Sequence, residues 1–292
     1  MKKGIIILAL KKDAYYCSAF NLAFSIKYHN PNINITLLTD GGHIRVYDAF
    51  KYSVFDNIKE IEKVDYTDNK GMFCPAKAKL NINKYSPYDN TLYIDADSLV
   101  TKDIEPAIDM LISAKGNFYA QYFGEGGIND AIHYQVWVEN QQLWDFFKLK
   151  ETDKIITVNS SWMFFTRKAT KIFKKFNENY NKNFDVNKLK VRWGGTLPDE
   201  LFIVGSLAQL NINPNANLNL MFFGNEIDSR TLLQLESDYY AFTLFGGGVG
   251  RTTVRDKYIT WYDRLLFKYL NNYNQEHRFK ADLILKNKHV NK

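Results

Sequence analysis

Two carboxylates one residue apart are the feature of this chain best suited to chemistry. Asp95 and Asp97 lie in the segment Leu92-Tyr-Ile-Asp-Ala-Asp-Ser-Leu-Val100, whose flanking apolar residues predict a buried strand that ends at the pair. An ionised carboxylate is costly to bury unless it is paired or binds a metal ion. Two oxygen ligands suit Mg²⁺ or Mn²⁺, and such an ion can hold a diphosphate and neutralise its charge as it leaves. The alternative is a turn with two solvated aspartates.

The elements before this strand are typical of a parallel sheet with crossover helices. They alternate in the order strand 4–10, a helix from Asp13 to before Pro31, strand 33–39, a weaker strand 54–61, helix 75–85 and the strand that ends at Asp95. Ligands of such sheets bind beyond the carboxyl ends of the strands. Asp40 follows the second strand, so it should lie on the same edge as Asp95 and Asp97.

The second half of the chain is less regular. We expect strands at 117–123, 155–166 and 242–245, a glycine-rich turn at 124–127, and helices at 138–147, 169–180 and 198–210. No internal repeat, low-complexity linker or clear domain break is visible. The sequence therefore predicts one large α/β domain.

Composition limits the class of protein. The chain has 292 residues, of which 46% are hydrophobic, ample for a sizeable core, and its two cysteines give no disulfide framework. The apolar run at 4–10 is short for a signal peptide and is followed by Lys11-Lys12-Asp13 without a convincing cleavage site, so a first core strand is the better interpretation. No stretch is long enough to span a membrane, and we expect a cytoplasmic protein.

Most of the basic excess lies at the C-terminus. Residues 263–292 carry a net charge of +4 out of +6 for the chain. Apolar residues at helical spacing, from Leu265 to Tyr273, predict a helical tail packed on the main body. Docking to an anionic membrane face or to nucleic acid is the alternative.

Four segments together resemble a known family. They are Ala76-Lys-Ala-Lys-Leu80, Ser86 to Val100 with its Asp-x-Asp strand, Val158-Asn-Ser-Ser-Trp-Met-Phe-Phe165 and Thr196-Leu-Pro-Asp-Glu-Leu-Phe202. In this order they resemble the GT-A nucleotide-sugar glycosyltransferases, especially the glycosyltransferase family 8-like group. The resemblance implies a GT-A (Rossmann-like) mixed, mainly parallel sheet flanked by helices. The catalytic domain would span 1–262, with a nucleotide-binding half at 1–100 and an acceptor half at 101–262, followed by the tail.

The resemblance also implies an activity. Such an enzyme moves a sugar from a nucleoside diphosphate sugar, here expected to be a UDP-hexose, to an acceptor hydroxyl with retention of configuration. The acceptor could be a glycan, a lipid-linked sugar, a protein or a modified nucleic-acid base. Asp95 and Asp97 would bind Mn²⁺ or Mg²⁺, and Asp95 would also touch the donor.

Further donor-binding residues follow from the same resemblance. Lys77 would contact the diphosphate or the sugar, with Lys79 as the second choice. The loop from Leu10 to Tyr16 would cradle the nucleoside, with Tyr15 stacking on the base, and Asp40 would bind its edge. For each, a structural role is the alternative: a solvated helix face, a core tyrosine or a turn cap.

The predicted catalytic residues come from the second half. Asn159 would line the sugar pocket, Asp199 would bind a donor hydroxyl, and Glu200 would lie near the anomeric carbon, where the family usually has glutamine. Glutamate is more nucleophilic and could stabilise an oxocarbenium-like centre. The helix dipole also favours carboxylates at a helix start, and a buried Asn-Ser-Ser network could be purely structural.

One segment departs from the family. The usual third metal ligand, a histidine, is missing from Phe242-Thr-Leu-Phe-Gly-Gly-Gly-Val-Gly-Arg251, so water or Thr243 would replace it. Arg251 stands where the family has lysine, and a guanidinium is a good diphosphate clamp. Two other functions stay open: a nucleotidyltransferase, although no glycine-rich loop near the N-terminus could grip a triphosphate, and a non-catalytic GT-A-like protein that binds a glycan or nucleic acid.

Overall fold

The computed structural model describes residues 1–11, 13–41, 54–68, 71–130, 138–182, 184–189, 197–224, 229–244 and 256–270. A six-stranded sheet in the order β3-β2-β1-β4-β7-β6 forms its centre. The strands are β1 (Lys3–Leu8), β2 (Asn34–Thr39), β3 (Asn57–Glu60), β4 (Asn90–Ile94), β6 (Phe118–Gly126) and β7 (Ile155–Thr166). The first four are mutually parallel, and β7 and β6 run antiparallel beside β4.

A second, three-stranded sheet lies beyond β4. It has the order β5-β9-β8, with β5 (Ser98–Val100), β8 (Met221–Phe223) and β9 (Ala241–Thr243). Since β5 begins directly after Asp97, the Asp-x-Asp pair forms the corner where the chain passes from one sheet to the other.

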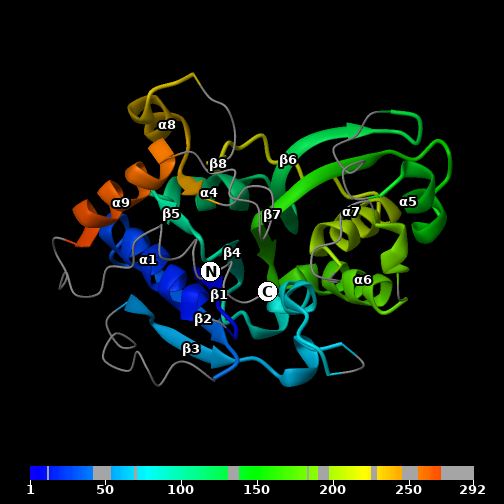
Figure 1. Cartoon of the computed structure of the whole chain (residues 1–292), viewed down its shortest axis with the longest axis horizontal. Coiled ribbons are helices and arrows are strands. Elements are labelled where there is room, and N and C mark those ends of the chain that lie inside the picture. The colour runs from blue at the N-terminus through cyan, green and yellow to red at the C-terminus, as the bar shows by residue number, and fades with distance from the viewer. Residues whose placement is uncertain are drawn as a thin grey trace.

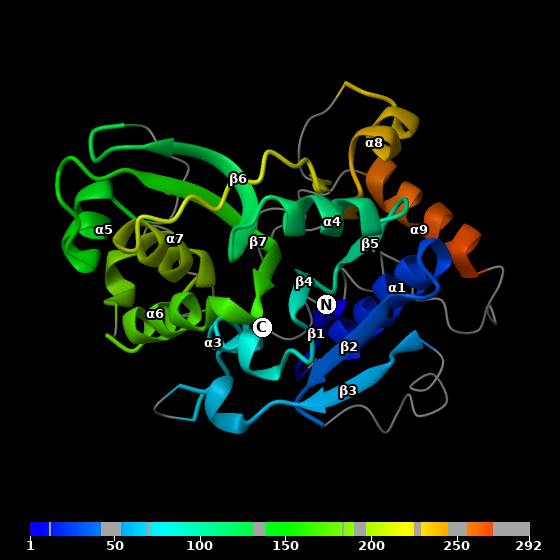
Figure 2. The same cartoon turned by 180° about the vertical axis from the view of Figure 1, so that it is seen from behind.

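Helices cover both faces of the central sheet (Figures 1 and 2). They are α1 (Asp13–His29), α3 (Pro75–Lys79), α4 (Glu105–Ser113), α5 (Asn140–Phe147), α6 (Thr170–Tyr180), α7 (Asp199–Gln209), α8 (Leu232–Asp238) and α9 (Asp256–Leu270). Short 3₁₀ turns occur at Lys63–Asp65, Ile82–Tyr85, Arg167–Ala169 and Val186–Lys188. Helices α1 and α9 lie at one end of the molecule and α5, α6 and α7 at the other.

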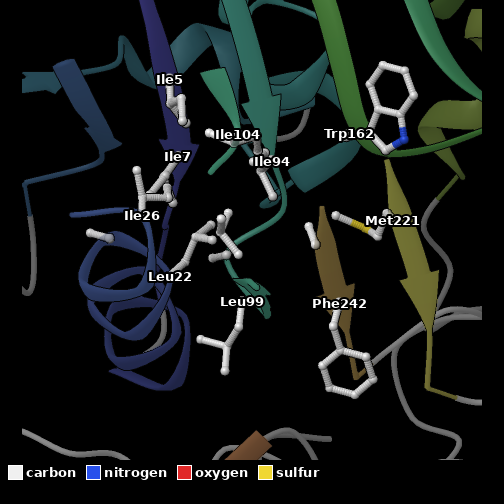
Figure 3. Packing of buried hydrophobic residues seen from close by; sticks show 14 of the residues in the cluster. Ile5, Ile7, Leu22, Ile26, Ile94, Leu99, Ile104, Trp162, Met221 and Phe242 are labelled. Atoms are coloured by element: carbon white, nitrogen blue, oxygen red, sulfur yellow. The ribbon is translucent and has the colours of Figure 1, made fainter. Parts of the chain in front are cut away.

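The sheet separates two hydrophobic clusters, because successive side chains of a strand point to opposite faces. Ile5 and Ile7 belong to the cluster that packs against α1, α9 and the small sheet, whereas Ile6 belongs to the cluster under α5, α6 and α7. Figure 3 shows the first cluster, in which Leu22 of α1 and Ile94 of β4 are also buried. Complete burial of these residues follows from the continuous apolar runs of β1, β2 and β4.

Helix α9 is tied to α1. Tyr262 accepts a hydrogen bond from Asn21 at 3.0 Å, and the rings of Tyr28 and Tyr269 lie 4.8 Å apart. The helix runs across residue 262, so the start of the basic tail packs on the main body as a helix. Residues 271–292 lie outside the described part of the chain. None of the described helices is both long enough and apolar enough to cross a membrane.

Most elements expected from the sequence are confirmed, and two were wrong in detail. The glycine-rich turn at 124–127 does not exist as such, because β6 continues to Gly126 and pairs with the start of β7. The helix expected at 75–85 is α3 followed by a 3₁₀ turn from Ile82. Asn81 between them turns back locally, its side-chain amide donating to the carbonyl of Lys77, the kind of bond by which asparagine competes with a helix.

Candidate active site

Strand β7 bends where β4 ends. Ala120 of β6 is opposite Met163, but the next residue, Gln121, is opposite Asn159, so residues 160–162 of β7 have no backbone ladder partners on β6. Bulges of this kind bend a strand and re-aim its side chains. Part of the bulge stays bonded to β4: Trp162 pairs with Ile94, and the amide of Asp95 donates to the carbonyl of Ser161 at 2.8 Å. The bend thus places the Asn-Ser-Ser segment against the first aspartate of the pair.

Lys79, near the end of α3, lies between the carboxylates of two elements. Its ammonium is 2.9 Å from Asp95 Oδ1 and 3.4 Å from Asp199 Oδ2, and it donates to Ser160 Oγ at 3.2 Å. It also lies 5.5 Å from the centroid of the Tyr93 ring, whose hydroxyl donates to Asp95. The lysine side chain is 14% exposed. These five residues, with Glu200, are called the lysine cluster below.

The first turn of α7 faces the β7 bend. Ser160 Oγ donates to Asp199 Oδ2 at 2.6 Å, and the Ser160 amide donates to Glu200 Oε1 at 3.1 Å. Pro198 precedes the helix, and no side chain caps it. The free N–H groups and the helix dipole favour negative charge there. Both carboxylates are therefore fixed by their own helix and by one serine of β7.

Burial and neighbouring charges shift the pKa values of Glu200, Asp95 and Lys79. Burial raises the pKa of Glu200 to about 8, and the negative charge of Asp199 adds to this. Burial also raises the pKa of Asp95, although Lys79 opposes the shift. Burial by itself lowers the pKa of Lys79, but Asp199 and Asp95 more than reverse this and hold it well above its ordinary value. At neutral pH Lys79 is therefore charged, and Glu200 is mostly protonated.

Asp97 follows Asp95 by two residues and directly precedes β5. It is half-buried, and its carbonyl accepts from the amide of Leu244 at 3.4 Å. Its negative charge contributes to the raised pKa of Asp95, so the two carboxylates act on each other. In the described part of the chain, no group of three or more His, Cys, Asp or Glu residues could hold a metal ion.

A second polar corner lies at the end of β2. The hydroxyl of Tyr16, in α1, donates to Asp40 Oδ1 at 2.6 Å and lies 2.8 Å from Thr39 Oγ1. Gly41 follows with φ +75°, and a Cβ there would lie 2.9 Å from the carboxylate carbon of Glu60. The turn after β2 therefore requires glycine. Burial and the bond to Asp40 raise the pKa of Tyr16, so its hydroxyl stays a donor.

The two candidate lysines of α3 are placed differently. Lys77 donates to the backbone carbonyl of Thr67 at 2.9 Å, whereas Lys79, the second choice from the sequence, joins the carboxylates. The two are less than a full helical turn apart, so they leave the helix in different directions. The structure thus brings Lys79, and not Lys77, to Asp95.

The other predicted residues differ in their surroundings. Leu10 is buried directly after β1, and Tyr15 is half-buried against the core. Asn159 lies in the β7 bend, where its side-chain oxygen accepts from the amide of Ser161 at 2.7 Å. Arg251 and the glycines at 246–250 lie outside the described residues.

Three contacts at these corners were missed from the sequence. Tyr93 precedes Asp95 by two residues, a spacing that places both side chains on one face of a strand, so this contact could have been predicted. Ser160 stands in the Asn-Ser-Ser segment, but its bonds to α7 depend on the bulge. Tyr16 reaches Asp40 only through the packing of α1 on β2, for which the sequence gives no local signal.

Comparisons with known proteins agree with this architecture. The sequence matches no protein-family model and no curated protein. Galactosyltransferase LgtC in complex with donor and acceptor sugar analogues is 17% identical with a TM-score of 0.58, covering 91% of this chain and 95% of that chain. An active-site glutamine-to-glutamate variant of LgtC is 15% identical with a TM-score of 0.58, covering 97% of this chain and 99% of that chain. The apo form of the bifunctional glycosyltransferase WbbM is 12% identical with a TM-score of 0.58, covering 97% of this chain and 51% of that chain.

At such low identity the likeness concerns the fold. The expected mixed sheet, with a parallel half and an antiparallel edge, is confirmed over almost the whole chain. The lysine cluster and the Tyr16–Asp40 corner lie at the carboxyl edge of its parallel strands. This chain therefore has the GT-A fold that these sugar-transferring enzymes share.

Proposed function

We propose that this protein is a glycosyltransferase that moves a sugar from a nucleoside diphosphate sugar to an acceptor hydroxyl. The observation that carries the proposal is the lysine cluster, which gathers a buried cation and three acidic side chains at the end of the Asp-x-Asp strand. A site that must hold a charged diphosphate beside a reacting sugar needs both kinds of charge. The fold shared with LgtC, crystallised with donor and acceptor sugar analogues, supports the same reaction class.

The donor would lie along the edge from β2 to β4. The Tyr16–Asp40 corner offers a carboxylate and a hydroxyl at the end of β2, which suit hydrogen bonds to a base or ribose. Leu10 and Tyr15 would be the residues that face the nucleoside. The diphosphate would then reach Asp95, Asp97 and Lys79. We take a UDP-hexose as the donor.

Asp95 and Asp97 would hold Mn²⁺ or Mg²⁺. Their chemistry fits a hard cation, because the negative charge of Asp97 contributes to the raised pKa of Asp95 and a divalent ion would relieve this repulsion. Two carboxylates suffice for Mg²⁺ when phosphate oxygens and water supply the other ligands. The ion would neutralise negative charge on the leaving diphosphate.

The other residues would bind and orient the sugar. Asp199 would accept a hydrogen bond from a donor hydroxyl, and Lys79 would fix Asp95 and Asp199 while adding positive charge beside the diphosphate. Glu200, held by the Ser160 amide, would lie next to the anomeric carbon. When ionised it can stabilise an oxocarbenium-like centre, which fits transfer with retention.

A donor panel tests this function. Native protein is incubated with sugar nucleotides of several nucleosides and Mn²⁺, and release of nucleoside diphosphate is measured. We expect turnover of at least one donor, and its loss in Asp97→Ala. Turnover that is equal in Asp97→Ala would contradict the proposal. Pyrophosphate release from a nucleoside triphosphate would point instead to a nucleotidyltransferase.

A further inference from the structure

A second concave site lies at the far end of α7. A cavity of about 900 Å³ opens between the end of α7, the connection from α5 to β7, the paired ends of β6 and β7, and α6. Helix α7 begins at Asp199 in the lysine cluster and has 11 residues, so this cavity lies about 16 Å along its axis from the candidate active site. We call it the basic groove.

Positive charge dominates the lining of the groove. Its lysines are Lys148, Lys150, Lys154 and Lys175. Two carboxylates, Glu125 and Asp153, oppose them, and Lys154 lies 3.4 Å from Glu125. Lys148 and Lys150 have no carboxylate within salt-bridge distance among the residues that the structure describes. Lys175 lies 4.0 Å from Glu178, which is outside the lining. Lys148 and Lys150, partly offset by Asp153, therefore leave a positive excess, which favours an anionic ligand.

The loop that carries these two lysines is held in place. Lys148 ends α5 in the left-handed conformation, with φ 53°. The amide of Leu149 donates to the Trp144 carbonyl at 3.0 Å, and the Trp144 indole donates to the Lys150 carbonyl at 3.0 Å. The Lys150 amide donates to Asp153 Oδ2 at 2.7 Å. A backbone fixed in this way loses little entropy when a ligand binds.

The walls of the groove indicate the shape of the ligand. Apolar groups line it at Leu149, Ile156, Leu207 and Ile212, and side-chain amides line it at Gln209, Asn211 and Asn213. Most of the lining is charged or polar, and the apolar groups form a smaller part of it. The volume is also far larger than a single phosphate or carboxylate needs. Sugar rings combine apolar faces with hydroxyls that amides can bind.

We propose that the basic groove binds an anionic oligosaccharide, whose acidic groups pair with Lys148 and Lys150 and whose rings rest on the apolar wall. This goes beyond the proposed transfer reaction, because the groove shares no side chain with the lysine cluster. The ligand would be a sugar chain that carries negative charge. Either carboxylate groups or phosphate groups on the sugars could supply this charge.

Calorimetry tests the groove with two charged probes and one neutral probe. The probes are an oligogalacturonate, a phosphorylated maltooligosaccharide and unmodified maltooligosaccharide. We expect native protein to bind at least one charged probe, more weakly at higher salt, and to bind the neutral chain much less. The pair Lys148→Glu/Lys150→Glu should lower the affinity at least about tenfold. Lys150→Glu alone should lower it less, and this variant leaves the left-handed residue unchanged.

The matched control is Lys168→Glu/Lys171→Glu, which changes the charge equally at two exposed positions outside the groove. This control should bind the probes with the native affinity. Asp97→Ala should also bind them with the native affinity, because loss of donor turnover in that variant reflects the active site and not the groove. Absence of binding to both charged probes, equal binding of the neutral chain, or an equal loss in the control would overturn the proposal. So would a polyglutamate peptide that binds as tightly as the sugars.

Discussion

The two polar corners of the sheet edge differ in charge. At the end of β4, Lys79 lies within 3.4 Å of carboxylates from two elements. At the end of β2, the hydroxyl of Tyr16 donates a hydrogen bond to Asp40. The same hydroxyl is hydrogen-bonded to the neighbouring Thr39. One corner is an ionic network and the other is a hydrogen-bonded carboxylate, although both follow parallel strands of one sheet.

The difference indicates a division of work along the edge. Ionic networks stabilise charge that changes during a reaction, whereas hydroxyls and a single carboxylate select among neutral groups by hydrogen bonding. We therefore expect changes at the β4 corner to affect turnover, stability and pH dependence. Changes at the β2 corner should affect recognition of the nucleoside.

The largest expected effect is the loss of Asp97. Asp97→Ala removes one of two oxygen ligands for the cation, and loss of that charge stabilisation should lower turnover about a thousandfold. Asp40→Asn should change the Michaelis constant for the donor more than the turnover number. Steady-state kinetics on both variants test whether the β4 corner serves turnover and the β2 corner serves recognition. An equal loss of turnover in Asp40→Asn and Asp97→Ala would contradict this assignment.

Lys79 should contribute most to stability. Lys79→Met leaves Asp95 and Asp199 without their cation, and removing one partner of a buried pair costs about 3 kcal/mol. The loss should be smaller at low pH, because the raised pKa of Asp95 favours its neutral form there. Lys77→Met removes one bond to a backbone carbonyl and should cost about 1 kcal/mol. Denaturant unfolding of both variants checks this, and equal costs would show that the ionic network adds no stability.

Glu200 should make stability depend on pH. Its pKa rises from 4.5 to about 8 on folding, so between these values the folded state binds a proton that the unfolded state has lost. Stability should therefore fall as the pH rises from 4.5 to 8, by up to about 1.4 kcal/mol per unit, and level off above 8.

Glu200→Gln tests this dependence, because glutamine keeps the shape without the titration. Unfolding free energies measured from pH 5 to 9 should change less steeply in the variant, whereas exposed Glu178→Gln should leave the native slope. If ionised Glu200 assists transfer, turnover should also rise toward pH 8 in the native enzyme only. An unchanged slope in Glu200→Gln would exclude this residue as the source.

The sequence was sufficient for the strands of the central sheet and for the positions of the carboxylates. It did not predict α4, β8 or α8, or the partners of the carboxylates. Apolar runs and strand–helix alternation predicted β1, β2 and β4, and Asp95, Asp97 and Asp199 could be located from local patterns. The choice between Lys77 and Lys79 depends on how α3 is rotated against β7, a long-range property that spacing alone does not determine.

The bend of β7 explains the other misses. Residues 160–162 leave the ladder with β6, while Trp162 stays paired with Ile94 of β4. An Asn-Ser-Ser segment does not show where a strand changes its pairing. The bulge turns Ser160 toward α7, so its contacts with Asp199 and Glu200 emerge only in the folded chain. Likewise, the basic groove collects lysines from segments about 25 residues apart in sequence, which no local motif would join.

The smallest expected effect concerns Tyr16. Tyr16→Phe keeps the ring and removes the hydroxyl that donates to Asp40, which should cost about 1 kcal/mol of stability. Asp40 then loses the partner that orients it, so affinity for the nucleoside diphosphate should fall severalfold while turnover at saturating donor stays near native. Titration calorimetry with nucleoside diphosphates, with Tyr15→Phe as the neighbouring control, measures this. A fall in turnover without a change in affinity would place the β2 corner in the reaction itself, and the contrast between the two corners would then fail.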